Sequence, residues 1–160
     1  MVMAGPGEDL RGIGGSGGES LDARLLGRVD AAFDCALDRA EAAVLALAAD
    51  APRTDRLAAL LAGLTGAAAA DRDLARLALV EAPGLGPGAL ARKDAAVGRL
   101  AGLLAREVAG PGTSQTASEM AAGGIYEVLQ RRLAAPGPAD PAALAADLAA
   151  LWLPVLTGDR

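Results

Sequence analysis

Histidine is absent from the 160-residue chain, and Cys35 is its only cysteine. Without histidine and with a single cysteine, one chain cannot form a Cys/His zinc site, a Ser-His-Asp triad or a Cys-His dyad. A single thiol also excludes an internal disulfide. We therefore expect no catalytic residue, no metal site and no cofactor, and the sequence predicts a protein that is not an enzyme.

Cys35 carries the only thiol in the sequence, a group that can act as a nucleophile when it is exposed. Helical spacing places it on the polar flank of a predicted helix, with Arg39 one turn later. An exposed thiol beside a positive charge is typical of a redox sensor. The chain has no second cysteine to resolve an oxidised thiol, so we favour an incidental thiol.

Gly12, Gly14 and Gly17 match the G-x-G-x-x-G spacing of nucleotide-binding loops. Such a loop binds phosphate where it joins a strand to the N-terminus of a helix. No strand pattern precedes these glycines, and residues 1–18 contain seven glycines in all. We therefore predict a disordered, glycine-rich tail over residues 1–19.

Composition favours helices over sheets. Hydrophobic residues make up 52% of the chain and aromatic residues only 2%, with Ala and Leu dominant. The net charge of −5 and a pI near 4.7 oppose binding to a phosphate backbone. Nothing at the N-terminus reads as a signal peptide, and no apolar run reaches the roughly 20 residues of a membrane helix, so we expect a cytoplasmic location.

Apolar residues recur every three or four positions after the glycine-rich tail, which predicts amphipathic helices. The second of them is apolar all round and is expected to be buried. Pro154 should kink or end the last one. Capping residues mark four starts: Ser20, Thr54, Thr116 with Glu119, and Asp140 before Pro141. Helices are predicted over 20–49, 71–82, 89–108 and 116–133, with two more after Thr54 and Asp140.

Six helices without a strand pattern or an internal repeat predict an all-α bundle. We expect it to form one domain over residues 20–158, because the chain holds enough apolar material for one core. Fold class alone does not specify function.

Four stretches of the sequence resemble the C-terminal domain of TetR-family transcriptional regulators. They keep the order and spacing of that domain and span about residues 28–158. The stretches are 31–34 (AAFD), 77–82 (LALVEA) with 86–87 and 91–94 (ARKD), 123–127 (GGIYE) and 151–156 (LWLPVL).

In that family a helix-turn-helix headpiece, which reads operator DNA, precedes the first long helix. Here the glycine-rich segment before Ser20 stands in its place. The resemblance therefore implies a regulator domain that meets DNA only through a headpiece not present in this chain. An incomplete chain, a misplaced start codon and a naturally headless relative all remain open.

The resemblance also implies a pocket for a small effector, which we expect to be mainly apolar and to lie among the first five helices. Tyr126, the only phenol, could hydrogen-bond a ligand or be satisfied by the backbone. The predicted lining residues are Phe33, Leu37, Leu60, Leu64, Leu77, Leu104, Met120 and Tyr126.

A homodimer is implied as well, with the last two helices of each subunit forming a four-helix interface. Gly123 and Gly124 each cost roughly 1 kcal/mol in a helix interior, which indicates close approach of another helix. We favour a helix of the partner over a weakened or kinked helix within one subunit. The predicted interface residues are Gly123, Gly124, Ile125, Val128, Leu129, Leu144, Leu148, Leu151, Trp152 and Val155.

Two other functions remain open. One is a structural or interaction bundle without a ligand, which would differ from the regulator domain only in lacking a cavity. The other is a helical enzyme acting on a hydrophobic substrate. It is disfavoured because the sequence has no D-D-x-x-D cluster and no E-x-x-H pair.

Overall fold

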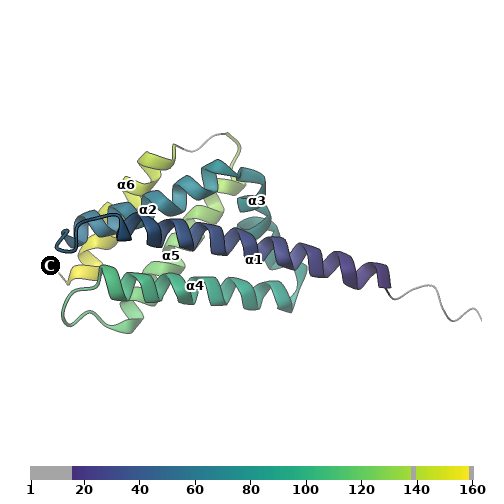
Figure 1. Cartoon of the computed structure of the whole chain (residues 1–160), viewed down its shortest axis with the longest axis horizontal. Coiled ribbons are helices and arrows are strands. Elements are labelled where there is room, and N and C mark those ends of the chain that lie inside the picture. Colours follow the sequence, from purple (N-terminus) through teal and green to yellow (C-terminus); the bar gives the residue numbers. More distant parts are fainter. Residues whose placement is uncertain (1–15, 138–139, 159–160) are drawn as a thin grey trace, which may run out of the picture.

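The computed structural model describes residues 16–137 and 140–158, and this part of the chain folds as an all-α bundle (Figure 1). Its elements are α1 (Ser16–Leu45), α2 (Arg53–Ala70), α3 (Arg72–Arg76), the π-helical turn η1 (Leu77–Glu81), the 3₁₀ turn η2 (Ala82–Leu85), α4 (Pro87–Glu107), α5 (Gln115–Ala134) and α6 (Pro141–Thr157). No strand occurs in these ranges, so the predicted fold class is confirmed. α1 and α4 lie side by side, and the first turns of α1 project beyond the bundle.

Two helix starts show how local side chains cap a helix. Asp140 caps α6 as predicted, because its Oδ1 accepts hydrogen bonds from the second and third amides of the helix at 2.9 and 3.3 Å. Ser114 caps α5 through a 3.2 Å hydrogen bond from the Ala117 amide to its Oγ. The predicted cap at Thr116 is therefore wrong, since Thr116 lies inside the first turn.

Three other helix ends, the two of α1 and the start of α2, differ from the prediction. α1 begins four residues before Ser20 and ends at Leu45 rather than near residue 49. Thr54 lies in the first turn of α2 and does not cap it. Pro154 was expected to kink or end the last helix, and α6 continues past it to Thr157. A proline removes one hydrogen bond of the helix, and here the adjacent turns hold the helix together.

The predicted tail over residues 1–19 falls mostly outside the described residues. Gly12 and Gly14 lie there too, whereas Gly17 lies in α1. Residues 16–19 are helical, so the first helix extends further than its apolar pattern indicated.

The helix predicted over residues 71–82 is observed as α3 followed by η1, with Pro83 just beyond it in η2. The carbonyl of Leu79 would accept a hydrogen bond from the amide four residues later in an α-helix, but Pro83 has no amide hydrogen. Tyr126 of α5 donates its hydroxyl to this carbonyl at 3.1 Å instead. The chain widens into η1 and tightens into η2 at this point. Tyr126 therefore ties η1 to α5.

α1 and α2 touch through their backbones at Gly63. A Cβ atom built there would lie 2.7 Å from the Cα of Ala40 and 2.8 Å from the carbonyl oxygen of Arg39. Only glycine permits so close an approach. Around this crossing lies the main core, whose fully buried members include Leu57, Leu60, Leu61, Leu104, Val108, Ile125 and Leu156.

α2 buries its leucines but not its whole circumference. Ala58 and Ala62 are exposed, so the prediction that this helix is buried on every side is wrong. The difference arises because α1 and α6, its main neighbours, cover the leucine face and leave the side with Ala58 and Ala62 to solvent.

Ion pairs run along the line where α1 meets α4. Three arginines seven residues apart on α4 bridge to carboxylates on α1. The pairs follow the same order along both helices, so the two helices run parallel. They are Arg92–Asp30 (2.8 Å), Arg99–Asp34, Arg99–Asp38 (3.2 Å) and Arg106–Glu41 (2.7 Å).

Candidate ligand-binding cavity

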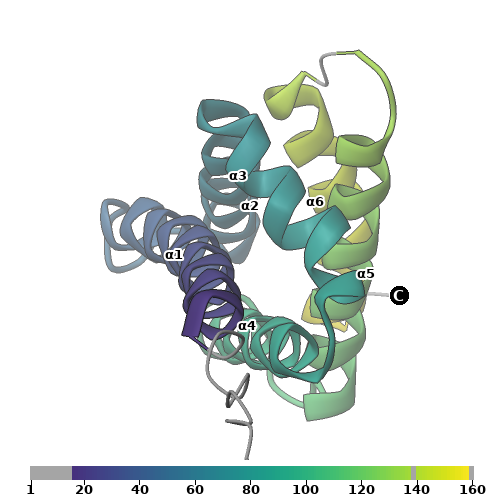
Figure 2. The same ribbon diagram turned by 90° about the vertical axis from the view of Figure 1, so that its right-hand side faces the viewer.

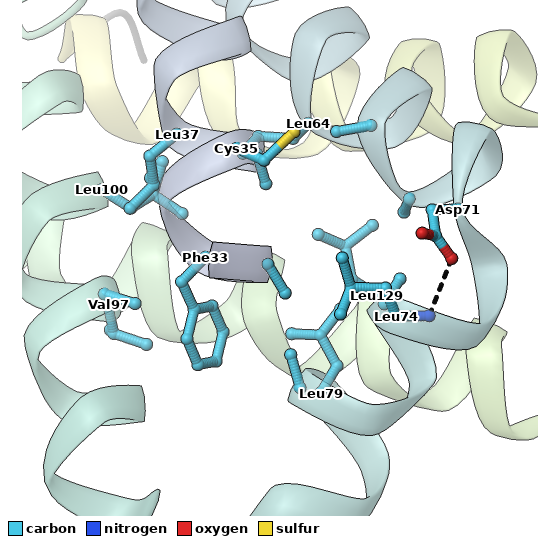
Figure 3. Close-up of a pocket in the computed structure, with 17 residues that line it drawn as sticks. Phe33, Cys35, Leu37, Leu64, Asp71, Leu74, Leu79, Val97, Leu100 and Leu129 are labelled. Atoms are coloured by element: carbon cyan, nitrogen blue, oxygen red, sulfur yellow. Dashed lines mark hydrogen bonds between the residues drawn. The ribbon is translucent and has the colours of Figure 1, made fainter. Parts of the chain in front are cut away.

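A cavity of about 90 Å³ lies between α1, α2, α4, α5 and the α3–η1 stretch. This stretch runs between α1 and α5, as Figure 2 shows. In the close-up, Phe33, Val97 and Leu100 lie on one side of the cavity and Asp71 and Leu74 on the other (Figure 3). The lining residues are Ala32, Phe33, Cys35, Ala36, Leu37, Leu64, Ala67, Ala68, Asp71, Leu74, Ala75, Ala78, Leu79, Ala96, Val97, Leu100 and Leu129.

Alanines account for the empty space. They supply seven of the 17 lining residues, and they come from α1, α2, α3, η1 and α4. A methyl group fills little of the volume between helices that leucines elsewhere hold apart. Phe33 is the only aromatic residue in the lining. Apolar cavities bind apolar molecules that fit them.

Cys35 and Asp71 mark the opening of the cavity, because both line it and both are exposed. Asp71 has a fixed orientation, since its Oδ1 accepts a 3.0 Å hydrogen bond from the Leu74 amide and so caps α3. Cys35 lies on the outward side of α1, and its predicted place on the polar flank is confirmed. The thiol therefore adjoins any molecule that enters.

Five of the eight predicted ligand-binding residues lie away from the cavity, while Phe33, Leu37 and Leu64 line it. Leu60 and Leu104 are 0% exposed and pack in the main core instead. The apolar stripes on α2 and α4 are broad, and these two positions face neighbouring helices in the main core rather than the cavity.

The other three residues of that set also lie elsewhere. Leu77 packs in a second, smaller core cluster with Val29. Met120 is 63% exposed on α5. Tyr126 lines a separate, more polar pocket of about 380 Å³ that also includes Lys93.

The hydroxyl of Tyr126 is held in its neutral form. Burial raises its pKa to about 12, and the negative charges of Glu127 and Asp94 add to that shift. The ammonium of Lys93 lies 5.7 Å from the centre of the ring. A neutral phenol is the donor that the Leu79 carbonyl requires, so Tyr126 supports the wall of the cavity from outside.

The sequence pattern did not predict the lining residues that η1, α4 and α5 contribute. Leu79, Val97, Leu100 and Leu129 line the cavity, as does Asp71 at its opening. One feature of the sequence could have indicated the cavity. Alanines recur in α2 and in the α3–η1 stretch, and their short side chains leave space between helices. The contribution of η1 could not be expected, since Pro83 alters the helical phase there.

The predicted dimer interface divides into a buried and an exposed part. Ile125, Leu129, Leu144 and Leu148 are no more than 8% exposed and pack inside their own subunit. Leu151 and Val155 are 57% and 43% exposed. Gly123, Gly124, Val128 and Trp152 are partly exposed. α2 packs against α6 within the subunit, a contact that the prediction did not consider.

Gly124 has a packing reason within one subunit. A Cβ atom there would clash with Cζ2 of Trp152, so the indole of α6 rests against the bare backbone of α5. At Gly123 nothing lies within 4 Å of the same position. The expected close approach of another helix is therefore present at Gly124, but the approaching helix belongs to the same chain.

The described residues provide neither a metal site nor a membrane-spanning helix. In 16–137 and 140–158, no three His, Cys, Asp or Glu side chains gather where they could hold a metal ion. Over those ranges, no helix combines the length and the apolar character needed to cross a membrane.

Comparison with known proteins bears on the fold. No protein-family profile and no curated protein matches the chain. A solved structure described as a bacterial regulatory protein in the TetR family from Rhodococcus RHA1 is similar, with a TM-score of 0.60 and 18% sequence identity. The match covers 85% of this chain and 74% of that chain. The fold is TetR-like. This agrees with the family that the four sequence stretches resemble.

Proposed function

We propose that the chain is the ligand-responsive dimerisation domain of a TetR-like transcriptional regulator. The observation that carries this proposal is the apolar cavity between α1, α2, α4 and α5 inside a TetR-like bundle. The effector is a small, mainly apolar molecule. Its binding would change the spacing of α1 relative to its neighbours, because Phe33 and Leu37 of α1 form one wall of the cavity.

The size of the cavity limits the effector. Drug-sized ligands occupy pockets of about 300–1,000 Å³, and a cavity of about 150 Å³ holds benzene. A cavity of about 90 Å³ accepts a narrower group such as an alkyl chain, with the rest of the molecule lying in the opening beside Cys35.

The test uses a panel of short alkyl and aryl compounds, with binding followed by thermal shift and NMR. Bound compounds should raise the melting temperature by mass action and should shift the resonances of Phe33 and Val97. Ala67→Leu places a larger side chain in the cavity and should abolish binding. Ala58→Leu, on the exposed side of the same helix, should leave binding intact. Binding that Ala67→Leu does not weaken would contradict the proposed site.

A homodimer through α5 and α6 belongs to the same proposal, now centred on the exposed Leu151 and Val155. Leu151→Glu should yield folded monomers, since the charge would be buried only against a partner. Leu148→Glu should instead unfold the subunit, because Leu148 is 2% exposed. Light scattering and circular dichroism separate the two effects. A monomeric wild-type chain at micromolar concentration would refute the dimer.

DNA enters this proposal only through a helix-turn-helix headpiece outside the described bundle. The net charge of −5 argues against DNA contact by the bundle itself. Mixed dimers with a subunit that carries a headpiece, or sequestration of the effector, are the actions open to the bundle alone.

The small size of the cavity favours a second candidate, an interaction bundle that binds no effector. Under that alternative Ala67→Leu would raise the stability by filling space, and no compound of the panel would shift the cavity resonances. The same experiment therefore decides between the two functions.

A further inference from the structure

One charge stands at the opening of the cavity. Asp71 is the only charged residue among those that line it, and Asp71 is exposed. Its Oδ1 accepts the hydrogen bond from the Leu74 amide, while Oδ2 has no hydrogen-bond partner in the described part of the chain (Figure 3). A molecule entering beside Asp71 thus meets a free carboxylate oxygen, a thiol and otherwise apolar side chains.

The arginines nearest to Asp71 in the sequence reach away from the opening. Arg72 donates a hydrogen bond to the Ala135 carbonyl at 3.2 Å, and Arg76 donates one to the Leu133 carbonyl at 2.6 Å. Both acceptors lie at the C-terminal end of α5, and neither arginine lines the cavity. The positive charge of this segment is therefore directed at α5.

The end of α2 and the start of α3 meet at Asp71. α2 ends at Ala70, and Ala67 and Ala68 of its last turn line the cavity. The last carbonyl groups of a helix lack partners within the helix and carry partial negative charge. The first amides of α3, which Asp71 caps, carry the opposite partial charge at the same place, so the carboxylate itself is what favours a cation here.

We propose that the cavity takes a ligand with a narrow apolar body and a cationic end, such as a primary alkylammonium, whose charge pairs with Asp71. This inference rests on the proposed effector-binding function and names the class of effector. A carboxylate of the same length binds worst, because no basic side chain lines the cavity and Asp71 repels it.

The test compares three probes of equal chain length, hexylammonium, 1-hexanol and hexanoate, by NMR titration of the full chain at low ionic strength. Hexylammonium should bind about fivefold more tightly than hexanol, the upper range for an exposed ion pair, and hexanoate should bind more weakly than both. The preference should shrink with added salt. Resonances of Phe33, Leu79 and Val97 should shift with the cation and with the alcohol.

Asp71→Asn separates the charge from the cap, because asparagine caps a helix as well as aspartate does. This variant should bind hexylammonium and hexanol with equal affinity. Asp73→Asn makes the same charge change on an exposed residue of α3 that does not line the cavity, and it should keep the preference.

The outcomes distinguish the cationic effector from the apolar cavity as a ligand site. Equal affinities of the three probes for the wild-type chain would overturn the cationic effector while leaving the apolar cavity as a ligand site. An equal loss of preference in Asp71→Asn and Asp73→Asn would overturn it as well, since overall charge would then explain the preference. Failure of all three probes to shift the cavity resonances would overturn the proposed function together with this inference.

Discussion

α1 and α2 pack in two different ways along one pair of helices. At the closed end, which we define by Gly63 against Arg39 and Ala40, the two backbones are in contact. At the open end, which we define by Ala36 and Ala67, the same helices stand apart and line the cavity. Less than two turns separate the two ends on either helix.

The difference shows that small residues have opposite effects in different surroundings. At Gly63 the backbone of α1 occupies the position that a side chain would take, so no space remains between the two helices. Ala67 leaves space, because the α3–η1 stretch and α5 prevent α1 and α2 from closing on it. A helix crossing is set by its closest contact, and the cavity lies where the helices diverge from that point.

The largest effect is expected at the closed end. Gly63→Ala should lower the free energy of unfolding by about 2 kcal/mol, because the clash with the α1 backbone outweighs the better helix propensity of alanine. Gly66→Ala, one turn later with nothing within 4 Å of its Cβ position, should raise it by up to about 1 kcal/mol. Urea denaturation measures both. Equal effects of the two substitutions would remove the distinction between contact and open space.

A smaller change in the free energy of unfolding is expected at Tyr126, which supports the open end. Tyr126→Phe should cost about 1 kcal/mol, since the Leu79 carbonyl loses its donor and Pro83 cannot replace it.

The same substitution gives a test of pH dependence. The raised pKa of Tyr126 means that the folded chain favours the neutral phenol, so this contribution to stability is complete below pH 10 and is lost as the pH rises through about 12. The stability difference between wild type and Tyr126→Phe should therefore narrow over that range. Urea denaturation of both proteins at several pH values measures it, and a difference that stays constant would contradict the raised pKa that burial gives the phenol.

The smallest effect is expected at the ion pairs beside the open end. Arg99→Gln should cost less than about 1 kcal/mol, because Arg99 and its two carboxylate partners are exposed, and 1 M salt should abolish the difference. Arg56→Gln is the matched change at the closed end. Arg56 bonds to Glu107 and to two carbonyl oxygens and is less exposed, so its loss should be larger. An equal loss at the two sites would show that burial does not govern these pairs.

Two residues of α5 illustrate what helical periodicity can and cannot predict. Met120 was expected at the cavity and Leu129 at a dimer interface, but Leu129 lines the cavity and Met120 is exposed. Nine residues at about 100° each place them on opposite sides of the helix. The sequence thus predicted that the two residues face different surroundings. Which side faces inward depends on where α4 and η1 lie.

The stripe on α6 shows a similar limit. Its apolar spacing correctly indicated a buried face, and Leu144 and Leu148 are buried. Burial against α2 and burial against a second subunit produce the same pattern of apolar residues. Of the α6 stripe, only Leu151 and Val155 are exposed and can contact a partner in the proposed dimer.

The sequence by itself determined the helical class, the Asp140 cap, the inward faces of Phe33 and Leu37 on α1, and the lack of a Cys/His site. These properties depend on residue type and on spacing within one helix. The tertiary structure alone decided that Gly63 joins two helices, that Gly124 receives Trp152, and that Asp71 stands at the opening of a cavity. The physical reason is that each of these depends on the distance and angle between helices far apart in the chain, which are set by the packing of all the side chains together.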